Sequence, residues 1–153
     1  MTDLKKLIHD LGDQPHTSEQ WHDWYNQFRS KTALEPHDVT LEEISADRIV
    51  LRMEIGDHAL QPYGLLHGGM SMMLAESAAS IHACWDVDLR KRVPVGIEIN
   101  GSHLRPATEG AVRVVGEVIR KSRTLVHHHV EIIHEETGKV LSTVRMTNLY
   151  KKM

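Results

Sequence analysis

The sequence predicts an α+β fold in which a mostly antiparallel sheet wraps around one central helix. The first observation is the small and apolar run at residues 71–84, which suits a helix buried on most sides and places that helix at about residues 69–84. The second is a set of strand-length runs rich in Val, Ile and Thr, at 93–104, 110–121, 124–135 and 139–150. Their short connections make neighbouring strands antiparallel.

An extra helical arm is expected before this fold. After an N-terminal cap expected at Thr17 or Ser18, four aromatic residues recur at helical spacing: Trp21, Trp24, Tyr25 and Phe28. A short first helix is expected over residues 3–11. Three roles are open for the arm: packing on its own domain, covering a ligand pocket, or contacting a neighbouring subunit.

The chain divides into a helical extension at 1–34 and one main domain at 35–153. The main domain begins with two runs, 38–44 and 48–56, that are expected to form a β-hairpin. In the later run 93–104, apolar and polar residues alternate, as expected of a strand with one buried face.

Composition narrows the classes of function. With 153 residues and a net charge of −3, the chain shows no bulk charge that would favour nucleic acid or an acidic membrane. Cys84 is the single cysteine and falls in the apolar helix, so we expect an inert core thiol. No stretch is long and apolar enough for a membrane span or a secretion signal, and we expect a cytoplasmic protein.

The candidate site lies at residues 61–77. A loop carrying Gln61 and His67 leads into Gly68 and Gly69, where the central helix begins. The first turn of a helix has unpaired N–H groups and a partial positive charge, and glycines let a ligand oxygen approach them. Together with the acid Glu76, these groups supply what acyl transfer needs. The ordinary alternative is that the glycines only start the helix and Glu76 pairs with a core arginine.

Glu76 and Ser80 are four residues apart and therefore share a face of the helix. Burying a lone carboxylate costs several kcal/mol, so an acid inside a buried helix is either functional or poorly paired. The ordinary interpretation of Ser80 is a buried serine that hydrogen-bonds to its own helix. The resemblance described next implies instead that Ser80 positions a water or the carboxylate.

The motifs of this stretch resemble a known family. They are Gln61, GLLHGG at 64–69, AES at 75–77, GIEIN at 96–100 and HLR at 103–105. In this order and spacing they resemble the hotdog-fold acyl-CoA thioesterases of the PaaI and 4-hydroxybenzoyl-CoA thioesterase group. Within the group, the chain is most similar to 1,4-dihydroxy-2-naphthoyl-CoA hydrolases and the enterobactin proofreading thioesterase. The resemblance covers about residues 35–150.

The resemblance implies hydrolysis of an aromatic or bulky acyl-CoA, with 1,4-dihydroxy-2-naphthoyl-CoA of menaquinone synthesis as one candidate. Glu76 would be the nucleophile or the general base, assisted by Ser80. Gly68, Gln61 and His67 would polarise the thioester carbonyl. No metal and no bound cofactor are expected, because the CoA thioester is itself the substrate.

The resemblance also assigns the CoA contacts to Gly69, His103, Arg105 and Arg123. Arginine suits phosphate because its forked donors are permanently charged. The ordinary alternative is that exposed arginines at strand ends are only solvated. In this family the site lies between two subunits of a homodimer, usually within a homotetramer, and we expect the same here.

Two other enzyme or binding classes are possible on the same fold. A hotdog dehydratase or hydratase normally has an Asp in its histidine loop, whereas the loop before His67 has none. A non-catalytic acyl-CoA-binding protein would have no need of Glu76. A metal site at residues 127–129, three consecutive histidines, is disfavoured because successive strand residues face opposite ways.

Overall fold

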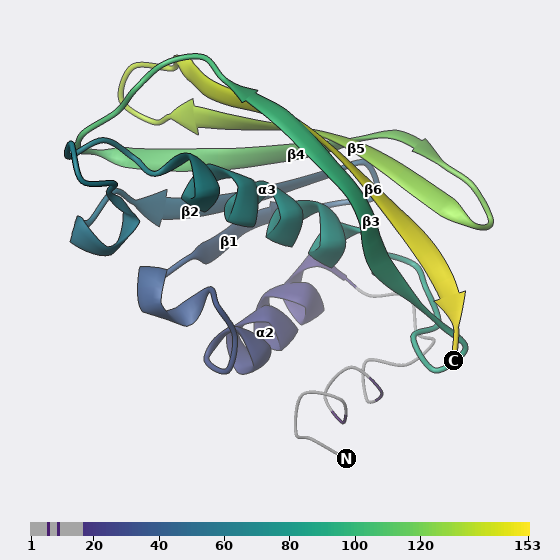
Figure 1. The fold of residues 1–153 in the computed structure, drawn as a ribbon. Coiled ribbons are helices and arrows are strands. Elements are labelled where there is room, and N and C mark those ends of the chain that lie inside the picture. Colours follow the sequence, from purple (N-terminus) through teal and green to yellow (C-terminus); the bar gives the residue numbers. More distant parts are fainter. Residues whose placement is uncertain (1–5, 7–8, 10–16) are drawn as a thin grey trace.

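A six-stranded antiparallel sheet curves around a central helix in the computed structural model, which describes residues 6, 9 and 17–153 (Figure 1). The strand order is β1-β2-β4-β5-β6-β3. The strands are β1 (Thr40–Ile44), β2 (Arg48–Glu54), β3 (Arg92–His103), β4 (Ala111–Lys121), β5 (Leu125–His134) and β6 (Val140–Lys152). Each run predicted to be a strand is one, with bounds shifted by a few residues. The α+β prediction is confirmed.

The central helix α3 (Gly68–His82) lies in the concave side of the sheet (Figure 1). Its buried face consists largely of Leu74, Ala75, Ala78 and Ala79. Small residues allow close approach of the strands, and a Cβ at Gly116 of β4 would lie 4.0 Å from Ala78 Cβ. The sheet therefore encloses α3 on most sides and leaves one side of the helix for the candidate site.

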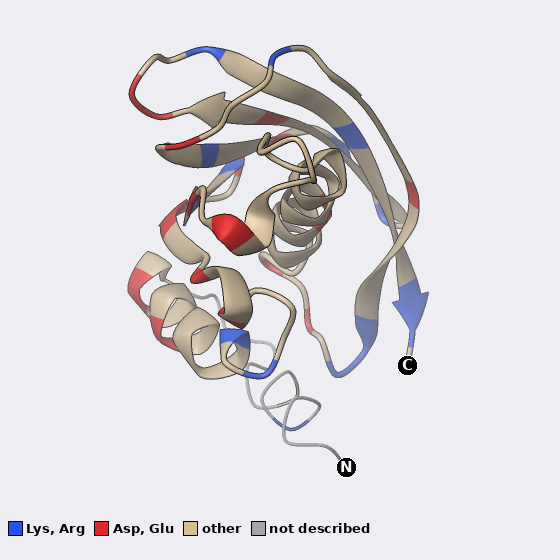
Figure 2. Cartoon of the chain, turned by 60° about the vertical axis from the view of Figure 1, so that its left-hand side comes forward, with Lys and Arg blue, Asp and Glu red and all other residues tan. Residues whose placement is uncertain are grey.

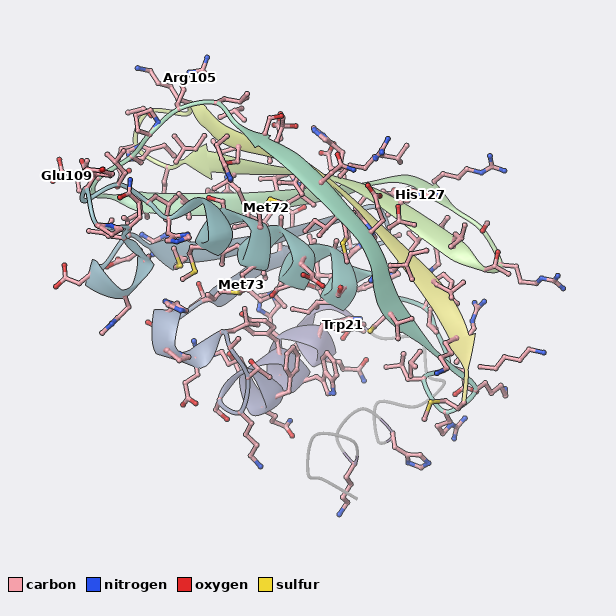
Figure 3. All side chains as sticks on the ribbon, in the orientation of Figure 1. Trp21, Met72, Met73, Arg105, Glu109 and His127 are labelled. Carbon is pink, nitrogen blue, oxygen red and sulfur yellow. The ribbon has the colours of Figure 1, made fainter. Side chains whose placement is uncertain are left out.

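The N-terminal arm packs on its own chain. Helix α2 (Ser18–Arg29) begins with the expected cap, in which Thr17 and Gln20 form a reciprocal capping box. Trp21 is fully buried and stacks on Trp85, which follows α3, with ring centroids 5.9 Å apart. Figure 3 shows Trp21 between α2 and the end of α3. The first of the three roles left open is thus observed within one chain, as far as the described residues go.

Two short 3-10 helices, η1 (Glu35–His37) and η2 (Asp57–Ala59), lead into β1 and into the loop before α3. The short helix expected at residues 3–11 lies outside the described residues, except for Lys6 and His9. No helix in the described part of the chain has the length and apolar character needed to cross a membrane.

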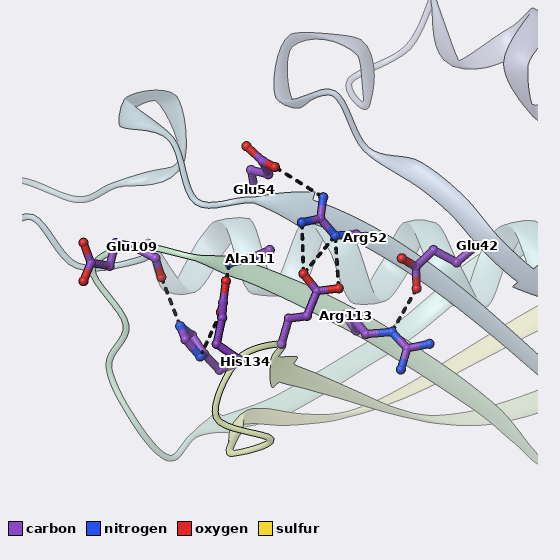
Figure 4. Close-up of polar contacts among 9 residues, drawn as sticks. Glu42, Arg52, Glu54, Glu109, Ala111, Arg113 and His134 are labelled. Carbon is purple, nitrogen blue, oxygen red and sulfur yellow. Dashed lines mark hydrogen bonds and ion pairs between the residues drawn. The ribbon is translucent and has the colours of Figure 1, made fainter.

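Ion pairs on the outer surface connect strands that have one other strand between them in the sheet (Figure 4). Arg52 of β2 pairs with Glu135 at 2.9 Å, and Arg113 of β4 pairs with Glu42 of β1 at 2.9 Å. Exposed ion pairs contribute about 0–1 kcal/mol each, less than the burial of one large apolar side chain. The strand register is therefore set mainly by burial of the apolar inner face. The ion pairs on the outer face add a smaller contribution.

The three consecutive histidines of β5 alternate between the two faces of the sheet, as predicted. His127 and His129 point outward and bond to Thr147 and Thr143 of β6, at 3.0 and 2.8 Å. His128 points inward and is fully buried. In the described part of the chain, no group of three His, Cys, Asp or Glu side chains is arranged to hold a metal ion.

Candidate active site

The start of α3 has one backbone amide with no hydrogen-bond partner among the described residues, and its residue, Gly68, lines a hollow in the surface. His67 caps the helix: its Nδ1 accepts a hydrogen bond of 2.8 Å from the Gly69 N–H. Its carbonyl oxygen accepts from the N–H groups of Met70 and Ser71, at 2.9 and 3.2 Å. Of the four first-turn amides that a helix cannot pair internally, the Gly68 N–H is the one that no described residue pairs, and it is available to a ligand.

These contacts separate the roles of the three residues. The Gly69 amide is used by the helix cap and is not available to a ligand. Gly69 can help a ligand only by having no side chain in its way. Because Nδ1 of His67 accepts a hydrogen bond, the proton of the neutral ring lies on Nε2. The Nε2–H of His67 is therefore a donor. His67 and Gly69 line a different hollow, with Leu60, Met70 and Met73, so the structure does not bring them together with Gln61 and His103.

A hollow of about 330 Å³ lies beside Gly68, and its walls include Gln61, Ser71 and His103. A Cβ at Gly68 would lie 2.5 Å from His103 Nε2, so only glycine lets the ring at the end of β3 approach the helix start. His103 Nδ1 is 2.9 Å from Ser142 Oγ on β6, and this contact orients the ring. The hollow brings together four predicted site residues: Gln61, Gly68, His103 and Arg105.

Gln61 is held by a tight turn. Its backbone N–H donates to the Leu65 carbonyl at 2.8 Å, and its carbonyl accepts from Gly64 at 2.8 Å. Gly64 has φ +77°, a conformation that favours glycine. The Gln61 Oε1 accepts from the Tyr63 N–H at 2.5 Å, which orients the side-chain amide and leaves its Nε2 as the donating end.

Glu76 lies elsewhere on α3, and here the structure corrects one expectation. We expected an acid inside a helix buried on most sides, whereas the Glu76 side chain is exposed. It lies over Gly96 of β3, where a Cβ would be 3.2 Å from Oε1. The reason is that β3 is an edge strand: β6 pairs with one of its sides and no strand among the described residues pairs with the other, so this side of α3 stays open.

Gly68 and Glu76 are too far apart to act on one carbonyl within one chain. They are eight residues apart on the same helix, which corresponds to about 12 Å along its axis. Gly68 contacts the end of β3 at His103, whereas Glu76 contacts its first half at Gly96. The structure therefore brings Gln61, Gly68 and His103 together and holds Glu76 apart from them.

Ser80 and a residue that sequence reasoning missed lie next to Glu76. Asn148 of β6 is fully buried, and its Nδ2 donates to Ser80 Oγ at 3.0 Å. A signal for Asn148 was present in the sequence. It shares the inner face of its strand with Val144, Met146 and Tyr150, so it is a polar residue at a core position.

The two predicted CoA-binding arginines lie at opposite ends of β3. Arg105 follows the end of this strand, beside the hollow, and its guanidinium donates to the Val140 carbonyl at 2.8 Å (Figure 3). Arg123 lies near the start of β3, because its carbonyl accepts from Arg92 at 2.6 Å. Twelve residues of strand span roughly 35 Å, so one chain does not bring these arginines together.

Basic residues gather at the Arg123 end of the sheet, where β6 ends and β3 begins (Figure 2). Lys151 and Lys152 pair with the first residues of β3. The Arg92 guanidinium lies 4.6 Å from the centre of the Tyr150 ring. Burial lowers the pKa of the nearby Lys121, whose ammonium donates to the Trp85 carbonyl at 2.8 Å. This end of a chain with net charge −3 is suited to anions.

Comparison with known proteins places this arrangement in a family. The model of the thioesterase superfamily matches residues 63–141, a segment that contains the start of α3, Glu76, Ser80, His103 and both arginines. The chain belongs to the thioesterase superfamily. Gln61 and Asn148 lie just outside the matched segment.

Relatives of this thioesterase agree with the assignment. The chain is 36% identical over 110 residues to 1,4-dihydroxy-2-naphthoyl-CoA hydrolase of Escherichia coli, covering 72% of this chain and 79% of the relative. It is 32% identical over 114 residues to the enzyme of the same name from Listeria monocytogenes, covering 74% and 91%.

The structure of a mutant of thioesterase PA1618 of Pseudomonas aeruginosa superposes with a TM-score of 0.82 at 27% identity, covering 94% of this chain and 99% of that one. Thioesterase HI1161 of Haemophilus influenzae gives a TM-score of 0.80 at 27% identity, covering 93% and 95%. The predicted hotdog fold and the predicted enzyme class, a thioester hydrolase, are confirmed.

Proposed function

We propose that this thioesterase hydrolyses the CoA thioester of an aromatic or similarly bulky acid, with release of CoA and the free acid. The observation that carries the proposal is Gly68 at the start of α3: its amide has no partner among the described residues, and it lines a hollow together with Gln61 and His103. Two relatives are named 1,4-dihydroxy-2-naphthoyl-CoA hydrolase, which makes that ester the first candidate substrate.

The hollow suits the thioester carbonyl. In the tetrahedral intermediate, negative charge develops on the carbonyl oxygen, and a helix-start amide stabilises it. The side chain of Gln61 lines the same hollow and is an additional donor. His67 lines a separate hollow, so within one chain its Nε2–H is not part of this donor set. Removal of one such donor in other acyl-transfer enzymes lowers turnover by about a hundredfold or more.

Glu76 supplies the attacking side of the reaction. Its carboxylate either attacks the carbonyl carbon, forming an anhydride that water then hydrolyses, or takes a proton from the water that attacks. Both routes consume one water, break the C–S bond and deliver a proton to the CoA thiolate. Neither route uses a metal or a bound cofactor, so we expect full activity in the presence of EDTA.

A second copy of the chain completes the site in this proposal. Because Gly68 and Glu76 are about 12 Å apart along α3, one carbonyl between them requires Glu76 from another chain. Strand β3 has a free edge suited to pairing with a second copy. When two β3 strands pair antiparallel, the start of one lies beside the end of the other. Glu76 lies over Gly96 in the first half of β3, so this pairing brings it toward the His103 end of the other copy.

The same pairing accounts for the two arginines. Arg105 at the end of one β3 comes near Arg123 at the start of the other, although the two are roughly 35 Å apart in one chain. Two guanidinium groups on one rim suit the phosphates of CoA. We therefore propose a homodimer with two shared sites, assembled in pairs as a tetramer, acting on CoA esters in the cytoplasm.

A panel of CoA esters tests the function. Benzoyl-, phenylacetyl-, 1,4-dihydroxy-2-naphthoyl- and palmitoyl-CoA are incubated with the enzyme, with and without EDTA, and thiol release is followed with a chromogenic disulfide. We expect the highest kcat/KM with an aryl ester and no effect of EDTA. Binding of these esters without thiol release would overturn the proposal, and a preference for palmitoyl-CoA would overturn the assigned substrate class.

A further inference from the structure

Asn148 combines complete burial with an unpaired oxygen. The residue lies on the inner face of β6 and is 0% exposed. Its Nδ2 donates to Ser80 Oγ at 3.0 Å, which joins β6 to α3. Among the residues that the structure describes, none donates to its Oδ1. An apolar side chain at this position would avoid that loss of hydrogen bonding, so stability by itself does not explain an asparagine here.

The surroundings of Asn148 belong to the candidate active site. Asn148 is the register partner of Gly96 on β3. A Cβ at Gly96 would lie 4.0 Å from Asn148 Nδ2 and 3.2 Å from Glu76 Oε1. Asn148 and Glu76 therefore flank the same glycine, and Ser80 lies one helical turn after Glu76 on the same face.

The direction of the hydrogen bond determines what Ser80 can do. A hydroxyl oxygen that accepts from Nδ2 still has its own proton to donate. Without an amide at this position, the serine would be free to turn and donate back to a carbonyl of its own helix. With Asn148 in place, the donor direction of Ser80 is restricted, and the Glu76 carboxylate is the acceptor one turn away on the same face.

We propose that Asn148 is a positioning residue for thioester hydrolysis. It holds Ser80 Oγ as an acceptor, so that the Ser80 hydroxyl donates to the Glu76 carboxylate and fixes its orientation toward the thioester. This inference rests on the proposed function, and it assigns to β6 a residue that acts through Ser80.

A purely structural tie between β6 and α3 is the competing explanation, and the chain offers a matched control. Tyr150 is also buried on the inner face of β6, two residues further along, and its hydroxyl donates to the Ala83 carbonyl after α3 at 3.0 Å. Tyr150→Phe removes a tie between the same two elements without touching Ser80. A structural role for Asn148 predicts that the two substitutions behave alike.

The experiment compares kcat, KM and unfolding midpoints of the full-length parent, Asn148→Leu, Ser80→Ala, the double variant and Tyr150→Phe. We expect Asn148→Leu and Ser80→Ala each to lower kcat at least about tenfold with KM within about threefold, as misplacement of a reacting group does. The double variant should be no slower than either single variant, because Asn148 acts through Ser80. Tyr150→Phe should lower the unfolding midpoint and leave kcat unchanged.

The pH dependence of kcat/KM distinguishes the two explanations, because loss of a purely structural contact would not shift the pH profile. A carboxylate that loses a hydrogen-bond donor holds its proton more tightly, so in Asn148→Leu the acidic limb should shift to higher pH. Asn148→Asp keeps the shape, and its neutral carboxyl donates to Ser80 whereas its ionised form does not. This variant should therefore lose activity at alkaline pH, where the parent keeps it.

The outcomes separate this inference from the proposed function. If the parent and Tyr150→Phe release no thiol from any CoA ester, the proposed function fails. If they are active and a folded Asn148→Leu matches the parent in kcat and pH profile, the positioning role is wrong. Effects of Asn148→Leu and Ser80→Ala that multiply in the double variant also overturn it. If Asn148→Leu does not fold, the test uses Asn148→Asp. Activity of this variant at alkaline pH equal to that of the parent also overturns the positioning role.

Discussion

The Glu76 carboxylate lies against Gly96, whose missing side chain makes room for it: a Cβ on this glycine would be 3.2 Å from Glu76 Oε1. The same Cβ would lie 2.6 Å from the terminal methyl of Met146, a flexible group that can move away. A methyl group at position 96 therefore displaces the carboxylate by a few tenths of an ångström while the sheet remains intact.

We predict that Gly96→Ala lowers kcat about tenfold, because small displacements of a reacting group are costly to turnover. Steady-state kinetics and a thermal unfolding scan measure the two effects together. Gly56→Ala is the matched control, since nothing lies within 4 Å of its Cβ position and it should leave kcat unchanged. Parent-like turnover of Gly96→Ala would mean that Glu76 does not need this position.

Substitution of Glu76 itself should separate chemistry from binding. We expect Glu76→Ala to lose at least about a hundredfold in kcat while still binding CoA esters, because the carboxylate reacts and does not dock the substrate. Glu76→Gln should lose activity similarly. As the side chain is exposed in the single chain, its free energy of unfolding should change by no more than about 0.5 kcal/mol.

Binding of CoA by these variants is measured by titration calorimetry with a non-hydrolysable CoA ester. A folded Glu76→Ala enzyme with near-normal turnover would contradict the assigned role. Glu76→Gln relieves no buried charge within one chain, because the Glu76 side chain is exposed there.

Mixing two inactive variants tests the shared site. In a mixed dimer of Glu76→Ala and Gln61→Ala, one site collects both defects and the other site is intact. Random mixing makes about half of the dimers mixed, so activity should recover to about a quarter of the parent value. The variants are unfolded and refolded together, and thiol release is compared with that of each variant refolded by itself.

Subunit exchange is checked by native mass spectrometry of the refolded mixture. Gln61→Ala must be nearly inactive by itself, as loss of a donor to the carbonyl oxygen should ensure. If mixed dimers form and activity does not recover, Glu76 and Gln61 work within one chain. Another conformation would then have to bring Glu76 closer to Gly68, since the two are about 12 Å apart along α3.

Two buried histidines make the fold sensitive to acid. His82 Nε2 is 2.9 Å from the Ser45 carbonyl, which can only accept, so Nε2 carries the proton. His82 Nδ1 then accepts from His128 Nε2 at 2.8 Å. His128 Nδ1 is left without a partner in the described part of the chain. Burial lowers the pKa of His128 to about 3 and also lowers that of His82.

We predict that stability falls as the pH drops below about 6.5, the pKa of histidine in an unfolded chain. A base whose pKa is lower in the folded state takes up more protons when unfolded. Its stability contribution is complete above the unfolded pKa and is lost as the pH falls toward the folded value. Each ring adds at most about 1.4 kcal/mol per pH unit to this slope.

The measurement is urea unfolding between pH 4.5 and 7.5 for the parent, His128→Leu and His127→Gln. His128→Leu should flatten the slope, because it removes one buried base. His127→Gln alters an outward-facing neighbour on the same strand and should keep the slope of the parent. Equal slopes for the parent and His128→Leu would show that the buried pair does not control acid stability.

Local patterns determined the elements and the residue types of the site. Alternation along residues 93–104 and the apolar run at 71–84 depend on the geometry of a single strand or helix, and both elements form. The buried face expected for the strand is wrong for the single chain: no residue of β3 is buried and Ile97 is 54% exposed, because β3 lies at the sheet edge. The glycines after His67 similarly indicated a helix start with an available amide, because helix termini leave N–H groups unpaired whatever surrounds them.

The exposure of site residues and their contacts across the sheet were decided by the tertiary structure, because they depend on more than one helix or strand. The exposure of Glu76 follows from the position of β3 at the sheet edge, which depends on the order of strands distant in sequence. The contact between Asn148 and Ser80 depends on the register of β3 and β6, including a shift between Gly96 and Glu98. Periodicity identifies the face a residue occupies, whereas strand order and register select its neighbours across the sheet.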